Sequence, residues 1–173
     1  ARFPGGAQPG GVSLCSGSVV PGGSASLNLS MTTSGGAQPA STQWTMSYSP
    51  FDIASVSVAA GSSASAATKG VSCASTIGST ICVAYGMNGN AINDGILALA
   101  TFNISAGSSN TMAPVQITAV SASNATGFGI TSTGNHGTIT SIQPIPPTFS
   151  YPTCTSPIAT TPGYAASPVH VTA

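Results

Sequence analysis

The sequence predicts an all-β sandwich, and two observations carry this expectation. Apolar residues alternate with small polar ones, as in "SASLNLSMTTS", where Leu27, Leu29 and Met31 share one face of an extended strand. No window of helical length carries an apolar period of 3.6 residues, and clusters of Gly, Ser, Asn and Pro separate the alternating runs. Short, half-buried strands joined by turns are typical of two packed sheets.

A second alternating run begins at Thr42. In "TQWTMSYS" the side chains of Trp44, Met46 and Tyr48 lie on one side of the strand, so we expect Trp44 in the core and not on a sugar-binding surface. The other expected strands, in chain order, are residues 53–61, 70–76, 80–86, 93–105, 113–123 and 137–142, with shorter ones near Ser13 and Phe128.

The most strand-like run is "NDGILALATFNIS", residues 93–105. Asp94 and Gly95 form the turn that precedes the strand. Leu97 and Leu99 are expected on the outer face together with Asn103, which makes the two leucines candidate assembly contacts. The inward face then consists of Ile96, Ala98, Ala100, Phe102 and Ile104.

Both ends of the chain are rich in Gly and Pro and lack either hydrophobic period. We expect residues 1–11 and 143–173 to be extended arms that flank one β-sandwich domain, residues 12–142. The C-terminal arm ends in "SPVHVTA", in which Val169 and Val171 alternate with polar residues. Such a segment can add to the sheet edge of a neighbouring molecule, and the alternative is an arm without a partner.

The chain is almost free of charge. Its formally charged side chains are Arg2, Lys69, Asp52 and Asp94, 2% of the residues, and the net charge is zero. Phosphate backbones and anionic lipid surfaces need clusters of Lys and Arg, so nucleic acid and membrane surfaces are excluded as partners. No run reaches the ~18 apolar residues of a membrane span. A neutral surface favours association between chains, or a coat of glycan.

Four cysteines predict two disulfides and therefore an oxidising, extracellular setting. If "VSCASTIGSTICV" is a hairpin that turns at Ile77 and Gly78, Cys73 faces Cys82 on a rung where side chains lie close together. Cys15 and Cys154 remain as the second pair. A bridge within one chain and a bridge between two chains both stay open for this pair.

Three Asn-X-Ser/Thr triplets, at Asn28, Asn103 and Asn124, are candidate glycosylation sites. Asn28 and Asn103 fall on the side of their strands opposite the largest apolar side chains, which points them toward solvent.

Acid–base catalysis would depend on Asp52, Asp94, His136 and His170. Both aspartates lie in turn-forming sequences, His136 lies in the turn "TGNHGT", and His170 lies in the C-terminal arm. There is no Gly-X-Ser-X-Gly elbow and no cysteine pair with zinc-site spacing. We therefore expect no enzyme, no metal and no cofactor.

The order of several motifs resembles a cohesin-type domain, the module that receives dockerins in cellulosome scaffolds. The motifs are Pro21-Gly22 before a long strand, "MSYSP" from Met46, Asp94-Gly95, and "FNI" from Phe102. The likeness covers roughly residues 11 to 142. It implies a secreted, non-catalytic jelly-roll β-sandwich of about nine strands. Because this chain lacks the charged side chains of a dockerin-binding face, the resemblance implies the fold and not the binding residues.

Two functions follow from these observations. The first is a secreted structural subunit that polymerises into a fibre, tube or surface layer through its sandwich faces and arms. The contacts for this assembly would be Leu97, Leu99, Val169 and Val171. The alternative is a monomeric cohesin-like module that binds a dockerin or a cell-surface ligand, including a carbohydrate.

Overall fold

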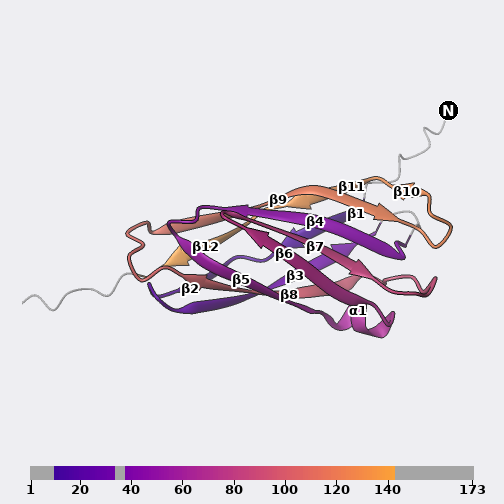
Figure 1. The fold of residues 1–173 in the computed structure, drawn as a ribbon, viewed down its shortest axis with the longest axis horizontal. Helices are drawn as coiled ribbons and strands as arrows, with labels where there is room; N and C mark the ends of the chain where they lie inside the picture. The colour runs from indigo at the N-terminus through magenta and orange to yellow at the C-terminus, as the bar shows by residue number, and fades with distance from the viewer. Residues whose placement is uncertain (1–9, 34–37, 143–173) are drawn as a thin grey trace, which may run out of the picture.

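The computed structural model describes residues 10–33 and 38–142, which form two packed β-sheets (Figure 1). The five-stranded sheet has the order β11 (Ser132–Asn135), β1 (Gly10–Leu14), β3 (Ser24–Thr32), β8 (Gly95–Ile104) and β5 (Ile53–Ala60). The seven-stranded sheet has the order β2 (Gly17–Val19), β12 (Gly137–Ser141), β9 (Met112–Ser123), β4 (Ser41–Tyr48), β7 (Ser79–Tyr85) and β6 (Gly70–Thr76), and β10 (Gly129–Ile130) pairs with β9.

The predicted all-β jelly-roll sandwich is confirmed, with differences in detail. The described residues form twelve strands where about nine were expected, and three of the twelve, β2, β10 and β11, are at most four residues long. β1 begins at Gly10, within the segment expected as an arm. One short helix, α1 (Ser62–Ala66), was not predicted, because five small residues carry no measurable helical period.

The core lies between the two sheets, where the alternating runs place their apolar side chains. Leu27, Leu29 and Met31 of β3 are buried, as the sequence predicts. Trp44 and Met46 of β4 have no exposed surface at all. Strand alternation is therefore a reliable guide to the inward face of β3 and of β4.

Leu97 is the main error of the sequence-based assignment for β8. Ala98 pairs with Leu29 and Ile96 pairs with Ser30, so Leu97 is an extra residue without a partner in β3. This bulge reverses the alternation on its N-terminal side. The Leu97 side chain consequently points inward and is 0% exposed. Its backbone carbonyl oxygen accepts a hydrogen bond from the Gly61 N–H (2.8 Å). Leu97 is therefore not on the outer face; Leu99 is, at 38% exposure.

The predicted Cys73–Cys82 disulfide is confirmed. The two residues are paired in the β6–β7 hairpin and their sulfur atoms are 2.08 Å apart. The turn consists of Ile77 and Gly78, and Gly78 has a φ of +75°. A type II turn requires this conformation at its third residue, which explains why the non-turn residue Ile77 is tolerated at the second.

Cys15 lies between β1 and β2 and is exposed. Its predicted partner Cys154, like Val169, His170 and Val171, lies outside the described residues. Ile142, the last described residue, donates its N–H to the Val19 carbonyl oxygen (2.8 Å) and so lies beside the end of β2. Cys154 lies twelve positions after Ile142 in the sequence, a length of chain that can span at most about 40 Å. This reach exceeds the four positions that lead from Val19 back to Cys15, which span about 14 Å when extended.

Replacement of Leu97 by Ala tests the bulge. We expect Leu97→Ala to lower the free energy of unfolding by about 2–4 kcal/mol, because it leaves a cavity between the sheets. The matched change Leu99→Ala, two residues along the same strand, is expected to cost less than about 1 kcal/mol. Urea unfolding followed by circular dichroism measures both. Equal losses for the two variants would contradict the inward position of Leu97.

The second disulfide is tested by thiol titration of the full-length, unreduced chain. We predict that Cys15 and Cys154 pair within one chain, so that no free thiol reacts with an alkylating reagent in denaturant. The same sample is expected to migrate as a monomer on a non-reducing gel. A covalent dimer that Cys15→Ser abolishes would show instead that the bridge joins two chains.

Candidate binding face

The outer surface of strands β9, β4, β7 and β6 is the most distinctive surface in the described residues, and we call it the β7 face. It bears apolar side chains from β7 and hydroxyl and amide side chains from the strands around it. Its members are Gln43, Thr45 and Ser47 of β4, Ile81, Val83 and Tyr85 of β7, Gln116, Thr118 and Ser121 of β9, and Ser72, Ala74 and Thr76 of β6.

β7 presents its larger residues outward. Its inward positions are Thr80, Cys82 and Ala84, which are all buried. Trp44 and Met46 of the neighbouring strand pair with Cys82 and Thr80, so large side chains lie next to small ones inside the sandwich. Ile81 and Tyr85 remain 43% and 53% exposed. In "TICVAYG" small and large side chains alternate, and the small ones face the core. An assignment by hydrophobicity alone would place the larger side chains, Ile81, Val83 and Tyr85, in the core.

Three shallow hollows lie along the β7 face. The first, about 210 Å³, lies between Gln43, Ala74, Ile81 and Val83. The second, also about 210 Å³, is lined by residues 47–49 together with Pro114 and Gln116. A third of about 170 Å³ connects Gln43 and Val83 to residues 121–123. Together they give a broad, corrugated surface without a deep pocket, a shape that fits a protein partner better than a small molecule.

The polar side chains of the two outer faces are used differently. On the five-stranded sheet, Ser24 donates to Asn103 (2.6 Å), Asn103 donates to Ser55 (2.8 Å), and Ser26 bonds to Thr101 (2.9 Å). This ladder satisfies the hydrogen-bonding groups of the sheet internally.

On the β7 face, four polar side chains are not hydrogen-bonded within the described part of the protein. The side chains of Gln43, Thr45, Gln116 and Thr118 make no hydrogen bond to any described residue. At the edges of the face, Ser41 bonds to Ser123 (2.8 Å), and the Thr76 hydroxyl donates to the Ser79 carbonyl oxygen (3.5 Å). Two amides and two hydroxyls are therefore free to bind a partner, next to the apolar surface of Ile81 and Tyr85.

No charged residue within the described ranges lies on the β7 face. Lys69 is buried and donates from Nζ to the Asn88 carbonyl oxygen (2.7 Å). Asp52 is buried and accepts from Ser108 (2.8 Å) and from Asn110 (2.9 and 3.1 Å). Two of the chain's four charges are thus used to fix loops.

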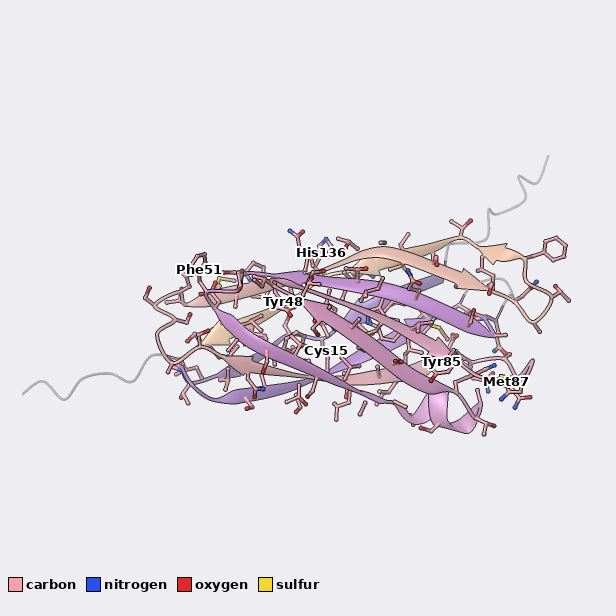
Figure 2. All side chains as sticks on the ribbon, viewed as in Figure 1. Cys15, Tyr48, Phe51, Tyr85, Met87 and His136 are labelled. Carbon is pink, nitrogen blue, oxygen red and sulfur yellow. A yellow bond between two sulfur atoms is a disulfide. The ribbon has the colours of Figure 1, made fainter. Side chains whose placement is uncertain are left out.

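Exposed apolar side chains also lie at the two ends of the sandwich. Figure 2 shows Tyr85 and Met87 at the end where α1 lies, and Phe51 at the opposite end. Met87 is fully exposed and Phe51 is 85% exposed. Tyr85 therefore continues the β7 face toward the loop that carries Met87.

The candidate catalytic residues within the described ranges, Asp52, Asp94 and His136, each accept hydrogen bonds from neighbouring parts of the sandwich. Asp52 and Asp94 lie at opposite ends of β8, since Ile53 pairs with Ile104 and Gly95 pairs with Met31. Asp94 accepts from the N–H and the hydroxyl of Thr33 (2.8 and 2.6 Å). His136 accepts the Ile117 N–H at Nδ1 (2.9 Å). The described part of the chain contains no group of three His, Cys, Asp or Glu residues that could hold a metal ion.

The candidate glycosylation sites occupy three different settings. Asn28 is exposed in the middle of β3, Asn103 takes part in the ladder on β8, and Asn124 lies in the turn between β9 and β10. Among the described residues, no helix is long and apolar enough to cross a membrane.

Comparison with solved structures identifies the architecture. A type I cohesin–dockerin complex of OlpA from Clostridium thermocellum matches with a TM-score of 0.68 and 13% identity over 78% of this chain and 100% of the other. The third cohesin of ScaC from Acetivibrio cellulolyticus, in complex with the ScaB dockerin, matches with a TM-score of 0.67 and 18% identity over 77% and 99% of the two chains. A non-cellulosomal cohesin from Archaeoglobus fulgidus matches with a TM-score of 0.64 and 13% identity over 78% and 92%.

No protein-family model and no curated protein sequence matches the chain. The expected resemblance is confirmed at the level of structure: the protein has the fold of cohesin domains.

Proposed function

We propose that this protein is an extracellular, non-catalytic binding module that captures a protein partner of the dockerin class on its β7 face. The observation that carries the proposal is the free amide and hydroxyl groups of Gln43, Thr45, Gln116 and Thr118 beside exposed Ile81 and Tyr85. An interface of this kind has an apolar centre and hydrogen-bonding groups around it. Several of the structurally similar cohesins were crystallised with dockerins, which supports the choice of partner class.

The partner must be recognised without ion pairs. Neither the β7 face nor its hollows contain a charged side chain within the described residues. A complementary partner surface is therefore neutral too, because an unpaired charge buried against this face would lose its hydration without compensation. This requirement distinguishes the module from one that attracts its partner through long-range electrostatics.

A carbohydrate ligand fits the face less well. Sugar-binding surfaces place aromatic rings in contact with the sugar, and Trp44 is buried in the core. Tyr85 is the only aromatic side chain on the β7 face as defined above.

The hypothesis of a structural subunit that polymerises has less support than that of a binding module. Of its two candidate contacts within the described residues, Leu97 is buried and Leu99 is partly exposed. Val169 and Val171 lie outside the described residues, and their pairing with a neighbouring sheet stays a prediction.

Substitutions on the two outer faces test the docking surface. We expect Ile81→Thr and Tyr85→Thr each to weaken binding of a dockerin-class partner by about tenfold, because truncating an apolar side chain that is covered in an interface costs ~1–2 kcal/mol. Thr keeps the strand preference of both positions. The control is Leu99→Thr on the five-stranded sheet, expected to leave the affinity unchanged. Calorimetric titration of the full chain with dockerin modules from the same genome measures all three.

Two results would contradict this proposal. Failure of the unaltered chain to bind any dockerin module of its own genome would remove the partner class. A loss of affinity for Leu99→Thr equal to that for Ile81→Thr would remove the β7 face as the site.

The salt dependence of the same titration tests the absence of ion pairs. We expect the dissociation constant to change by less than about threefold between ~50 mM and ~500 mM NaCl, because screening acts only on charges. The association rate should likewise stay within the ordinary range for unsteered complexes, about 10⁵–10⁶ M⁻¹s⁻¹. Weakening by more than tenfold over this range would show that charged groups outside the β7 face take part.

A further inference from the structure

The three Asn-X-Ser/Thr triplets differ in whether their amide nitrogen is free and whether their backbone can leave the fold. Attachment of a glycan needs both, since the modifying enzyme must reach Nδ2 and accommodate the triplet in its own site. Residues at exposed turns are reached most easily, and central strands open only with much of the domain.

Asn103 fails on both counts. Its Nδ2 already donates to Ser55 Oγ (2.8 Å), and its Oδ1 accepts from Ser24 (2.6 Å). Its strand, β8, lies between β3 and β5, and Asn103 itself is paired with Ser24 on one side and with Ser55 on the other. A sugar on this nitrogen would have to displace a rung of the ladder that joins three strands.

Asn28 fails on the second count. Its side chain is exposed, but the residue is paired with Leu99 of β8 on one side, and its carbonyl oxygen accepts the Cys15 N–H (3.0 Å) on the other. Leu29, the middle residue of the triplet, is 0% exposed. The triplet can reach an enzyme only if β3 separates from both neighbours.

Asn124 satisfies both requirements. Its Oδ1 accepts from the Thr126 N–H (3.0 Å), the Thr126 hydroxyl (2.8 Å) and the Phe128 N–H (2.9 Å). The carboxamide oxygen is therefore held toward the turn, and no described group accepts a hydrogen bond from Nδ2. The hydroxyl that completes the triplet already contacts the side chain that would be modified.

The turn around Asn124 is also open. Residues 125–129 are exposed, and nothing lies within 4 Å of the position a Cβ would take at Gly127 or Gly129. The turn is closed locally by the bonds from Asn124 N to Phe128 O (2.9 Å) and from Gly127 N to Asn124 O (3.0 Å). Opening it breaks these few bonds and no part of the core.

We propose that Asn124 is the glycosylation site of the folded protein and that Asn28 and Asn103 are not acceptors. The donor is a polyprenyl-diphosphate-linked oligosaccharide. A bond forms between Nδ2 and C1 of the first sugar, the bond from C1 to the diphosphate oxygen breaks, and one Nδ2 proton passes to a base of the transferase. The glycan would stand just beyond Ser123, at the end of the β7 face, and would hydrate a surface that has almost no charge to do so.

The test uses the folded full chain, made in a host without N-glycosylation. It is incubated with a single-subunit oligosaccharyltransferase that accepts Asn-X-Ser/Thr and with the lipid-linked donor, and intact mass and site mapping report occupancy. Synthetic peptides spanning each triplet serve as unfolded references. We expect all three peptides to be modified, whereas the folded chain is modified at Asn124 at a rate at least ~100-fold above the other two sites, because strand opening is rare.

Asn124→Asp is the matched variant. Its carboxylate can accept the same three hydrogen bonds, so the turn and the thermal midpoint should be retained while modification of the folded chain is lost. Ser105→Ala removes the Asn103 triplet and is expected to leave the glycan in place. Modification of Asn28 or Asn103 in the folded chain at a rate within about tenfold of that of Asn124, or no modification of Asn124 when its peptide is a substrate, would overturn the proposal.

Discussion

The burial of Trp44 against small residues is the constraint on which the rest of the structure depends. Its indole has no exposed surface, and its Nε1–H has no hydrogen-bond partner among the described residues, so it contributes to the core through volume. A side chain of this size can be packed between two sheets only if its neighbours are small. Cys82, its partner across the strand pair, and Ala84 meet this requirement.

The outward position of Ile81, Val83 and Tyr85 follows from the same constraint. Once Cys82 and Ala84 face Trp44, strand alternation sends the larger side chains of β7 to the other side of the sheet. The disulfide between Cys73 and Cys82 holds edge strand β6 in register beside them. The pairing register of β4 and β7 therefore determines both the core and the proposed binding face. The apolar side chains of the β7 face are exposed because the inward positions of β7 are held by small residues.

Two of the few charged side chains of the chain are buried and hold loops in place, which composition alone does not reveal. Asp52 fixes the loop of Ser108 and Asn110 beside the start of β5, and Lys69 fixes the loop of Asn88. Because Asp52 and Lys69 are buried, Asp94 is the one exposed charged side chain among the described residues, and the β7 face consists of hydroxyls, amides and apolar groups. Such a surface can form specific contacts only through shape and hydrogen bonding, which is the basis of the proposed neutral interface.

Much of the fold could be predicted from the sequence, and the errors have physical reasons. The inward faces of β3 and β4 and the register of the Cys73–Cys82 hairpin follow from alternation and turn chemistry. Leu97 was placed outward because a bulge leaves no mark in a run of aliphatic residues. The β7 face was missed because the side of a strand that faces the core depends on the size of its neighbours, here Trp44, and pairing between strands distant in sequence is not contained in either strand alone.

The central claim is that the large side chains of β7 serve the surface and not the core. The most direct test is the free energy of unfolding of the triple variant Ile81→Thr, Val83→Thr and Tyr85→Thr, measured by urea titration. The account predicts a loss below about 1.5 kcal/mol, since these half-exposed groups lose little burial. A loss of about 4 kcal/mol or more, the size expected for truncating core side chains, would contradict it.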